Sequence, residues 1–155
     1  MIEERLRELG IRLPAARVPA FQYQAVLQHG DTAYVSGQLP WDGKCGLITG
    51  KLGAQLDLVQ GAAAARACML QALAALYVAL GSLDRIERVL KLTGFVASAP
   101  GFIEQPKVID AASGLLIEVF GDAGRHARSA VGVAELPRGA AVEIELIVAV
   151  RAQAR

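Results

Sequence analysis

The chain has 155 residues, of which 54% are hydrophobic and 20% charged, and its formal net charge is +1. This length fits one domain of ordinary size. The apolar content exceeds what the core of one small domain needs, which indicates that part of the surface is buried against another chain. The near-neutral charge does not favour a nucleic acid partner, because nucleic-acid-binding domains usually carry a strongly basic surface. We therefore expect a single domain over residues 1–155.

Compartment and membrane association are predicted from the N-terminus, the longest apolar run and the cysteines. The charged segment Met1–Leu6 lacks the apolar run of a signal peptide, and the run Ala67–Leu80 is too short to span a bilayer. Cys45 and Cys68 show no C-x-x-C spacing and no nearby histidines at metal-binding distance, so we expect free thiols in a reducing compartment. The chain is predicted to be cytoplasmic, without a membrane partner or a metal.

The periodicity of apolar residues predicts two helices and five strands after a short N-terminal helix. Apolar residues at three- and four-residue spacing indicate a long helix, which Asp57 caps together with Gln60. Pro106 fits the first turn of the second long helix. In chain order the predicted elements are helix 2–9, ended by Gly10, an extended arm over 12–20, strands 23–28 and 32–36, a glycine-rich loop 41–53, helix 58–80, strand 89–97, helix 105–120, and strands 128–135 and 141–150.

This order, ββαβαββ, predicts an α/β (α+β) domain with one mixed sheet and two helices on one face. The last strand alternates between a wholly apolar face and a face of small residues with a few charges. Because a solvated sheet face normally carries many long polar side chains, we expect the second face to pack against another subunit.

Arg128 and Glu143 are the strongest candidates for chemistry. If the last two strands form a simple hairpin, both residues lie on the same sheet face, roughly 20 Å apart at about 3.3 Å per residue. They would then share a small ligand only across a subunit boundary, or each would form a structural ion pair at an interface. The planar guanidinium of Arg128 suits a carboxylate, and a partly desolvated Glu143 suits the activation of water. Glu145 could act in the same way or be a solvated ion-pair partner.

The remaining reactive residue types give weaker signals. His126 and His29 are expected in loops, Cys68 in the core, and Cys45 in a loop where it is either reactive or a spectator. The sequence contains no phosphate-binding loop, dinucleotide fingerprint or zinc pattern. We therefore expect no cofactor.

Several short motifs together resemble the RidA (YjgF) family, in the branch often labelled endoribonuclease L-PSP-like. They are Tyr23, Ser36-Gly37-Gln38-Leu39-Pro40, Arg128-Ser129, Leu136-Pro137 and Val142-Glu143-Ile144-Glu145. The resemblance implies a chorismate-mutase-like fold and a homotrimer whose sheets form an inner barrel, with ligand clefts between subunits. The implied activity is hydrolysis of reactive enamines and imines, such as 2-aminoacrylate, to 2-keto acids and ammonia.

The resemblance also implies roles for individual residues. Arg128 would hold the carboxylate of the ligand, and Glu143 would lie near the attacking water. Tyr23, Ser36 and Gly37 would line the cleft.

Two positions depart from the family pattern. Ala130 stands where many deaminating members have a cysteine, although its backbone carbonyl could still serve. Asp110 stands where asparagine is common, and its carboxylate would repel an acidic substrate unless it is protonated or paired with Arg128.

Three alternatives to a deaminase remain open at this point. The same cleft could bind keto acids without catalysis, and release of ammonia would separate these two functions. RNA cleavage, which the family label names, predicts a basic groove that the near-neutral charge does not favour. Chorismate mutase activity rests on shared architecture alone.

Overall fold

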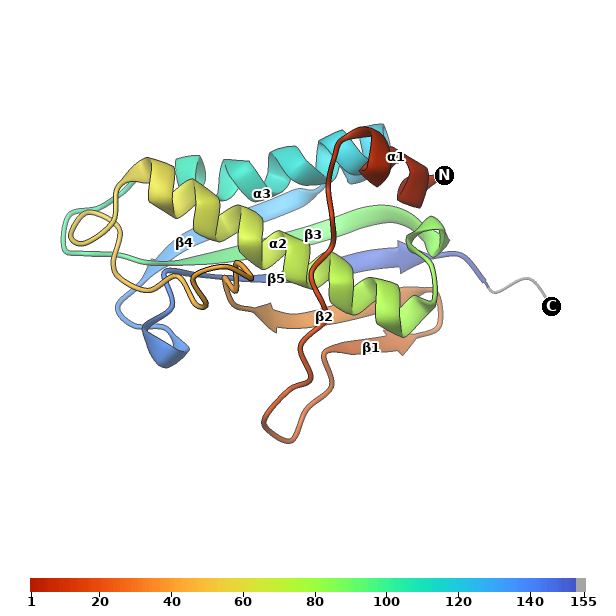
Figure 1. The fold of residues 1–155 in the computed structure, drawn as a ribbon, viewed down its shortest axis with the longest axis horizontal. Helices are drawn as coiled ribbons and strands as arrows, with labels where there is room; N and C mark the ends of the chain where they lie inside the picture. The colour runs from red at the N-terminus through yellow and green to blue at the C-terminus, as the bar shows by residue number, and fades with distance from the viewer. Residues whose placement is uncertain (153–155) are drawn as a thin grey trace.

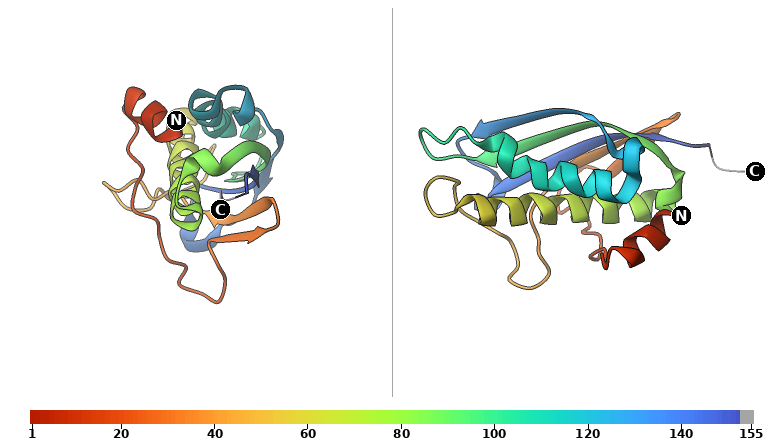
Figure 2. Two further views of the ribbon diagram at one scale, coloured as in Figure 1. Left: turned by 90° about the vertical axis from the view of Figure 1, so that its right-hand side faces the viewer. Right: turned by 90° about the horizontal axis from the view of Figure 1, so that it is seen from above.

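A five-stranded mixed sheet carries two long helices on one face, as Figures 1 and 2 show for the computed structural model, which describes residues 1–152. The predicted fold class and the order ββαβαββ are confirmed. In chain order the elements are α1 (Ile2–Glu8), β1 (Val26–His29), β2 (Thr32–Gln38), α2 (Leu58–Leu80), the 3-10 turn η1 (Leu83–Arg85), β3 (Ile86–Ala97), α3 (Gln105–Phe120), η2 (Gly121–Gly124), β4 (Ala127–Val133), η3 (Pro137–Gly139) and β5 (Val142–Val150).

The strand order across the sheet is β1-β2-β5-β3-β4, which overturns the predicted hairpin between the last two strands. β4 pairs with β3 in parallel, and β5 lies between β2 and β3, antiparallel to both. The physical reason is that a strand–helix–strand crossover through α3 makes β4 parallel to β3 at the sheet edge. The chain then returns past β3, and β5 completes the centre of the sheet.

This strand order places Arg128 and Glu143 on opposite faces of the sheet, so the expectation of a shared face is wrong. Arg128 lies opposite Leu92, which is buried beneath the helices. Glu143 lies opposite Phe95, on the face that no helix covers. Two strand spacings and three residues along the strands separate their Cα positions by about 14 Å. A small ligand cannot contact both groups within one chain.

The long helix α2 is the central element of the core. Its predicted capping box is confirmed, since Gln60 N donates to the Asp57 carboxylate at 2.8 Å and Asp57 N donates to Gln60 Oε1 at 2.9 Å. Gly81 ends the helix with a φ of 81°, in the left-handed region that favours glycine. By length and composition this helix could cross a membrane, but 67% of its apolar window is buried in the domain, as in the core helices of globular proteins.

The N-terminal helix α1 is fixed to the turn that follows α2. The Glu3 carboxylate accepts hydrogen bonds from Ser82 Oγ at 2.7 Å and from Leu83 N at 3.1 Å. Ile2 N donates to Asp84 Oδ1 at 2.6 Å. The arm that follows α1 crosses α2 and descends to the ends of β1 and β2 (Figure 1). These contacts fix the start of the arm, whose last residues line the candidate site.

Two glycines, one inside α3 and one in the η2 turn after it, give opposite predictions for stability. A Cβ at Gly124 would overlap the backbone carbonyl of Leu116, whereas a Cβ at Gly114 would meet nothing within 4 Å. Gly124→Ala should therefore lower the melting temperature, since the backbone must move. Gly114→Ala should stabilise the helix interior by roughly 0.5–1 kcal/mol, a shift of about 1–4 °C. Thermal unfolding by circular dichroism checks both, and a stabilising Gly124→Ala would contradict this packing.

Candidate functional site

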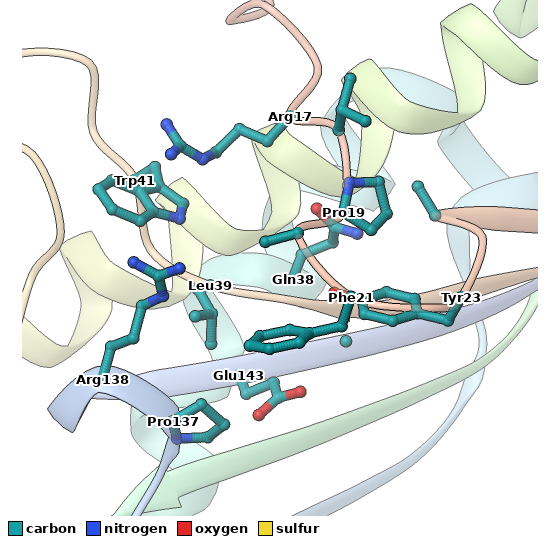
Figure 3. Close-up of a pocket in the computed structure, with 14 residues that line it drawn as sticks. Arg17, Pro19, Phe21, Tyr23, Gln38, Leu39, Trp41, Pro137, Arg138 and Glu143 are labelled. Atoms are coloured by element: carbon teal, nitrogen blue, oxygen red, sulfur yellow. The ribbon is translucent and has the colours of Figure 1, made fainter.

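A cleft of about 370 Å³ opens at the end of the sheet where the N-terminal arm meets β2 and β5 (Figure 3). The arm forms one wall, the segment after β2 forms a second, and the η3 turn closes the third side. Its lining residues are Arg17 to Phe21, Tyr23, Ala25, Gly37 to Leu39, Trp41, Pro137, Arg138 and Glu143. Three residues expected from the sequence, Tyr23, Gly37 and Glu143, thus meet in one cavity.

Of the acidic residues that the structure describes, Glu143 on β5 alone lines this cleft. It has room because its neighbour on β2 is Gly37, where an added Cβ would overlap Oε1 of the carboxylate. Burial raises the pKa of Glu143 above its ordinary value, and the nearby charge of Glu145 raises it further. Among residues 1–152, no group donates a hydrogen bond to this carboxylate. The arrangement leaves a partly desolvated proton acceptor facing open space.

Sequence reasoning missed most of the walls of the cleft. The Arg17 guanidinium lies 3.7 Å from the centroid of the Trp41 ring, a cation–π contact that fixes the arm against the segment after β2. Arg138 projects from η3 with a φ of 61°, which is unusual for a residue other than glycine. Phe21 is 75% exposed on the arm. The sequence offered one signal for these walls: Phe21 is an aromatic residue at the end of a proline-containing arm that is not expected to pair with a strand.

Ser36 supports the cleft from behind. Its hydroxyl donates to the carbonyl of Gln24 at 2.6 Å, and Ser36 N donates to the carbonyl of Ala25. These bonds hold the end of the arm beside β2. The side chain of Ser36 faces a neighbouring hollow that Tyr34 and Ile147 also line. Ser36 therefore holds the residues that follow Tyr23 in place, and its own side chain does not line the cleft.

Arg128 belongs to a second polar cluster, under α3. Its Nη1 donates to Asp110 Oδ1 at 2.7 Å and to Ser113 Oγ at 3.2 Å. His126 continues the network, with Nε2 at 2.9 Å from Ser113 Oγ and Nδ1 at 2.6 Å from the carbonyl of Gly124. Because a carbonyl only accepts, Nδ1 is the donor to Gly124, while Nε2 and Ser113 Oγ share the second hydrogen bond. The network fixes one end of the guanidinium.

The second cluster settles the position of the two residues that depart from the family pattern. Asp110 is paired with Arg128, which was one of the conditions under which a carboxylate at this position would not repel an acidic ligand. Ala130 follows Arg128 on the same face of β4 and packs against the core below α3. Both therefore lie with Arg128 and away from the cleft of Glu143.

The cysteines lie outside both clusters. Cys45 is exposed in the loop before α2, and Cys68 is buried, as expected. The Cys68 thiol donates to the carbonyl of Val142 at 3.4 Å, and burial, followed by the charge of Glu143, raises its pKa well above the ordinary value. In residues 1–152, no three His, Cys, Asp or Glu side chains come together as metal ligands would.

These features define a small α+β protein with a carboxylate-centred cleft at one end of its sheet, and comparisons with known proteins agree with the resemblance seen in the sequence. The model of the YjgF/chorismate mutase-like endoribonuclease family matches residues 3–148. The chain therefore belongs to this family.

Three relatives illustrate its range. Protein TCP17 of Trypanosoma cruzi is 51% identical over 148 residues, covering 95% of this chain and 92% of that protein. A 2-iminobutanoate/2-iminopropanoate deaminase of Dermatophagoides farinae is 30% identical over 141 residues, covering 90% and 94%. The crystal structure of Atu1372 from Agrobacterium tumefaciens, a protein of unknown function, superposes with a TM-score of 0.87 at 46% identity, covering 97% and 94%.

The raised pKa of Glu143 predicts how stability depends on pH. Below the ordinary glutamate pKa, Glu143 is protonated in both the folded and the unfolded chain, and burial of a charge then does not reduce the free energy of unfolding. As the pH rises from that value through the higher folded pKa, ionisation destabilises the folded protein. Glu143→Gln cannot ionise and avoids this destabilisation. The melting temperature of the variant minus that of the wild type should therefore become more positive from pH 4 to pH 7. A difference that stays constant with pH would contradict the desolvation of Glu143. Asp122→Asn, on a fully solvated carboxylate, serves as the control.

Proposed function

We propose that this protein hydrolyses imines derived from amino acids to 2-keto acids and ammonia, in clefts formed between the subunits of a homotrimer. The observation that carries the proposal is Glu143, a carboxylate with a raised pKa and no hydrogen-bond donor among residues 1–152, at the floor of a cleft. The similarity to an iminobutanoate/iminopropanoate deaminase supports this choice of reaction.

The proposed chemistry needs a carboxylate anchor and a proton acceptor. Arg128 holds the carboxylate of the imine through the nitrogens that its network leaves free. Glu143 orients a water molecule and accepts its proton as the oxygen attacks the imine carbon. The resulting carbinolamine collapses to the keto acid, and ammonia leaves. A raised pKa makes Glu143 a stronger base than an ordinary solvated carboxylate.

The proposed trimer supplies the two groups from different chains. Arg128 lies on β4, the edge strand, and its side chain is 24% exposed, so a neighbouring chain can reach it. The sheet face that lacks helices carries exposed or half-buried apolar side chains on all five strands. They are Leu27, Tyr34, Phe95, Val131 and Ile147. Burial of such a face against a second copy is favoured by the hydrophobic effect.

A charge on the uncovered sheet face should therefore break the assembly. The wild-type protein is expected to sediment at three times the 16.3 kDa mass of the chain. Val131→Asp, on the uncovered face, should shift it to the monomer, since a carboxylate would be buried without a partner. Val78→Asp, on the exposed side of α2, should remain trimeric. A wild-type monomer at micromolar concentration would remove the basis of the shared cleft.

Mixed trimers test the division of labour between chains. Arg128→Ala should lose about 2–5 kcal/mol of carboxylate binding, and Glu143→Gln should lose turnover while it still binds a keto acid. Each variant alone should release little ammonia from a system that generates 2-aminoacrylate. After the two are unfolded and refolded together, roughly a quarter of the clefts regain both wild-type groups by random assembly, and activity should return in proportion.

Three results would contradict the proposal. A mixture without activity would show that the two groups do not act in one cleft. A Glu143→Gln variant with wild-type turnover would exclude this residue as the base. Binding of 2-oxobutyrate by the wild-type protein without any ammonia release would favour the alternative function, a keto-acid-binding protein that lacks catalysis.

A further inference from the structure

The Arg128–Asp110 pair leaves both hydrogen-bond donors and a hydrogen-bond acceptor unused. Only Nη1 of the guanidinium is engaged, so Nε and Nη2 have no hydrogen-bond partner among residues 1–152. Asp110 uses only Oδ1, and its side chain is 68% exposed against 24% for Arg128. Free N–H donors and a free carboxylate oxygen therefore lie side by side at the surface of α3 and β4.

The pair has no net charge, and this limits what it can attract. A ligand that carries a single negative charge is drawn to Arg128 and repelled by Asp110 at almost the same distance, because the two groups are 2.7 Å apart. A simple keto acid therefore gains less from the pair than a ligand that also carries a positive charge. A zwitterion gains from both groups, since its carboxylate can pair with Arg128 and its cationic nitrogen with Asp110.

The spacing of charges in a 2-imino acid matches this arrangement. Its carboxylate group and its protonated nitrogen are both attached to C2, and the guanidinium and carboxylate of the pair are likewise direct neighbours. Ser113 also holds Nη1, so the guanidinium keeps its orientation when the cationic nitrogen of a ligand competes for the Asp110 carboxylate.

We propose that Asp110 makes this site selective for zwitterions, so that it binds protonated 2-imino acids more tightly than the 2-keto acids formed from them. This inference rests on the proposed function, since it takes Arg128 as the carboxylate anchor. Asp110 contacts the iminium nitrogen and favours the protonated imine, which is the form that water attacks.

The net charge of the ligand changes as the reaction proceeds. The iminium group and one water molecule yield a carbonyl group and an ammonium ion, and the remaining keto acid has lost its positive charge. Asp110 now faces a monoanion, and the repulsion promotes release of the product. The same carboxylate that attracts the substrate thus limits inhibition by the product.

A matched pair of ligands tests this selectivity. L-2-aminobutyrate and 2-oxobutyrate share one carbon skeleton and differ in the cationic nitrogen. Titration followed by NMR or calorimetry should show that the wild-type trimer binds the amino acid at least tenfold more tightly than the keto acid. Asp110→Asn should reduce this ratio at least tenfold, by weakening the amino acid and strengthening the keto acid. Glu104→Gln, which breaks an exposed ion pair with Lys107 at the start of α3, should leave the ratio unchanged.

The outcomes separate this inference from the proposed function. An unchanged ratio in a folded, trimeric Asp110→Asn variant would overturn the selectivity, while ammonia release by the wild-type protein would still support imine hydrolysis. Binding of both acids that persists in Arg128→Ala would overturn the anchor and the selectivity together. If the wild-type trimer binds neither acid and releases no ammonia, both proposals fail.

Discussion

Strand β5 is hydrogen-bonded along both edges, to β2 and to β3, and this double pairing fixes where Glu143 lies relative to Gly37 and Arg128. One face of the strand packs beneath α2. The other carries Glu143 beside Gly37 of β2, at the point where the β2–β5 register shifts. Because β3 lies between β5 and β4, the same pairing sets the distance from Glu143 to Arg128.

Several parts of the fold were predictable because local sequence determines them. The capping box at Asp57, the glycine that ends α2 and the alternation of β5 are decided within a few residues of chain. The neighbours of a strand are not decided locally. The short connection before β5 favours a hairpin, and only the sheet as a whole shows that β4 already pairs with β3. With the wrong neighbour, Arg128 would lie in line with Ala149, whereas the true pairing places it in line with Leu92 and therefore on the opposite face.

The candidate site could be predicted in part. The motifs around Tyr23, Gly37 and Glu143 point to residues that do lie in one cleft. The sequence left two ways in which Asp110 would not repel an acidic ligand, protonation or pairing with Arg128, and the structure shows the pairing. Arg17 could not be found in this way, because its place in the cleft depends on the path of the arm after α1. Likewise Ser113 and His126 become partners of Arg128 only once α3 lies over β4.

The close approach of Gly37 and Glu143 links the evolutionary histories of two positions that are far apart in the chain. A Cβ at position 37 would overlap the carboxylate of Glu143 in its present rotamer, so a side chain there requires the Glu143 side chain to turn away. Any descendant that acquires even an alanine at position 37 must move or shorten the acidic residue at 143, and with it the group facing the cleft. The two positions should therefore change together or remain as they are. A lineage in which glycine has been replaced at position 37 is therefore expected to hold the carboxylate at 143 in a different orientation in this cleft.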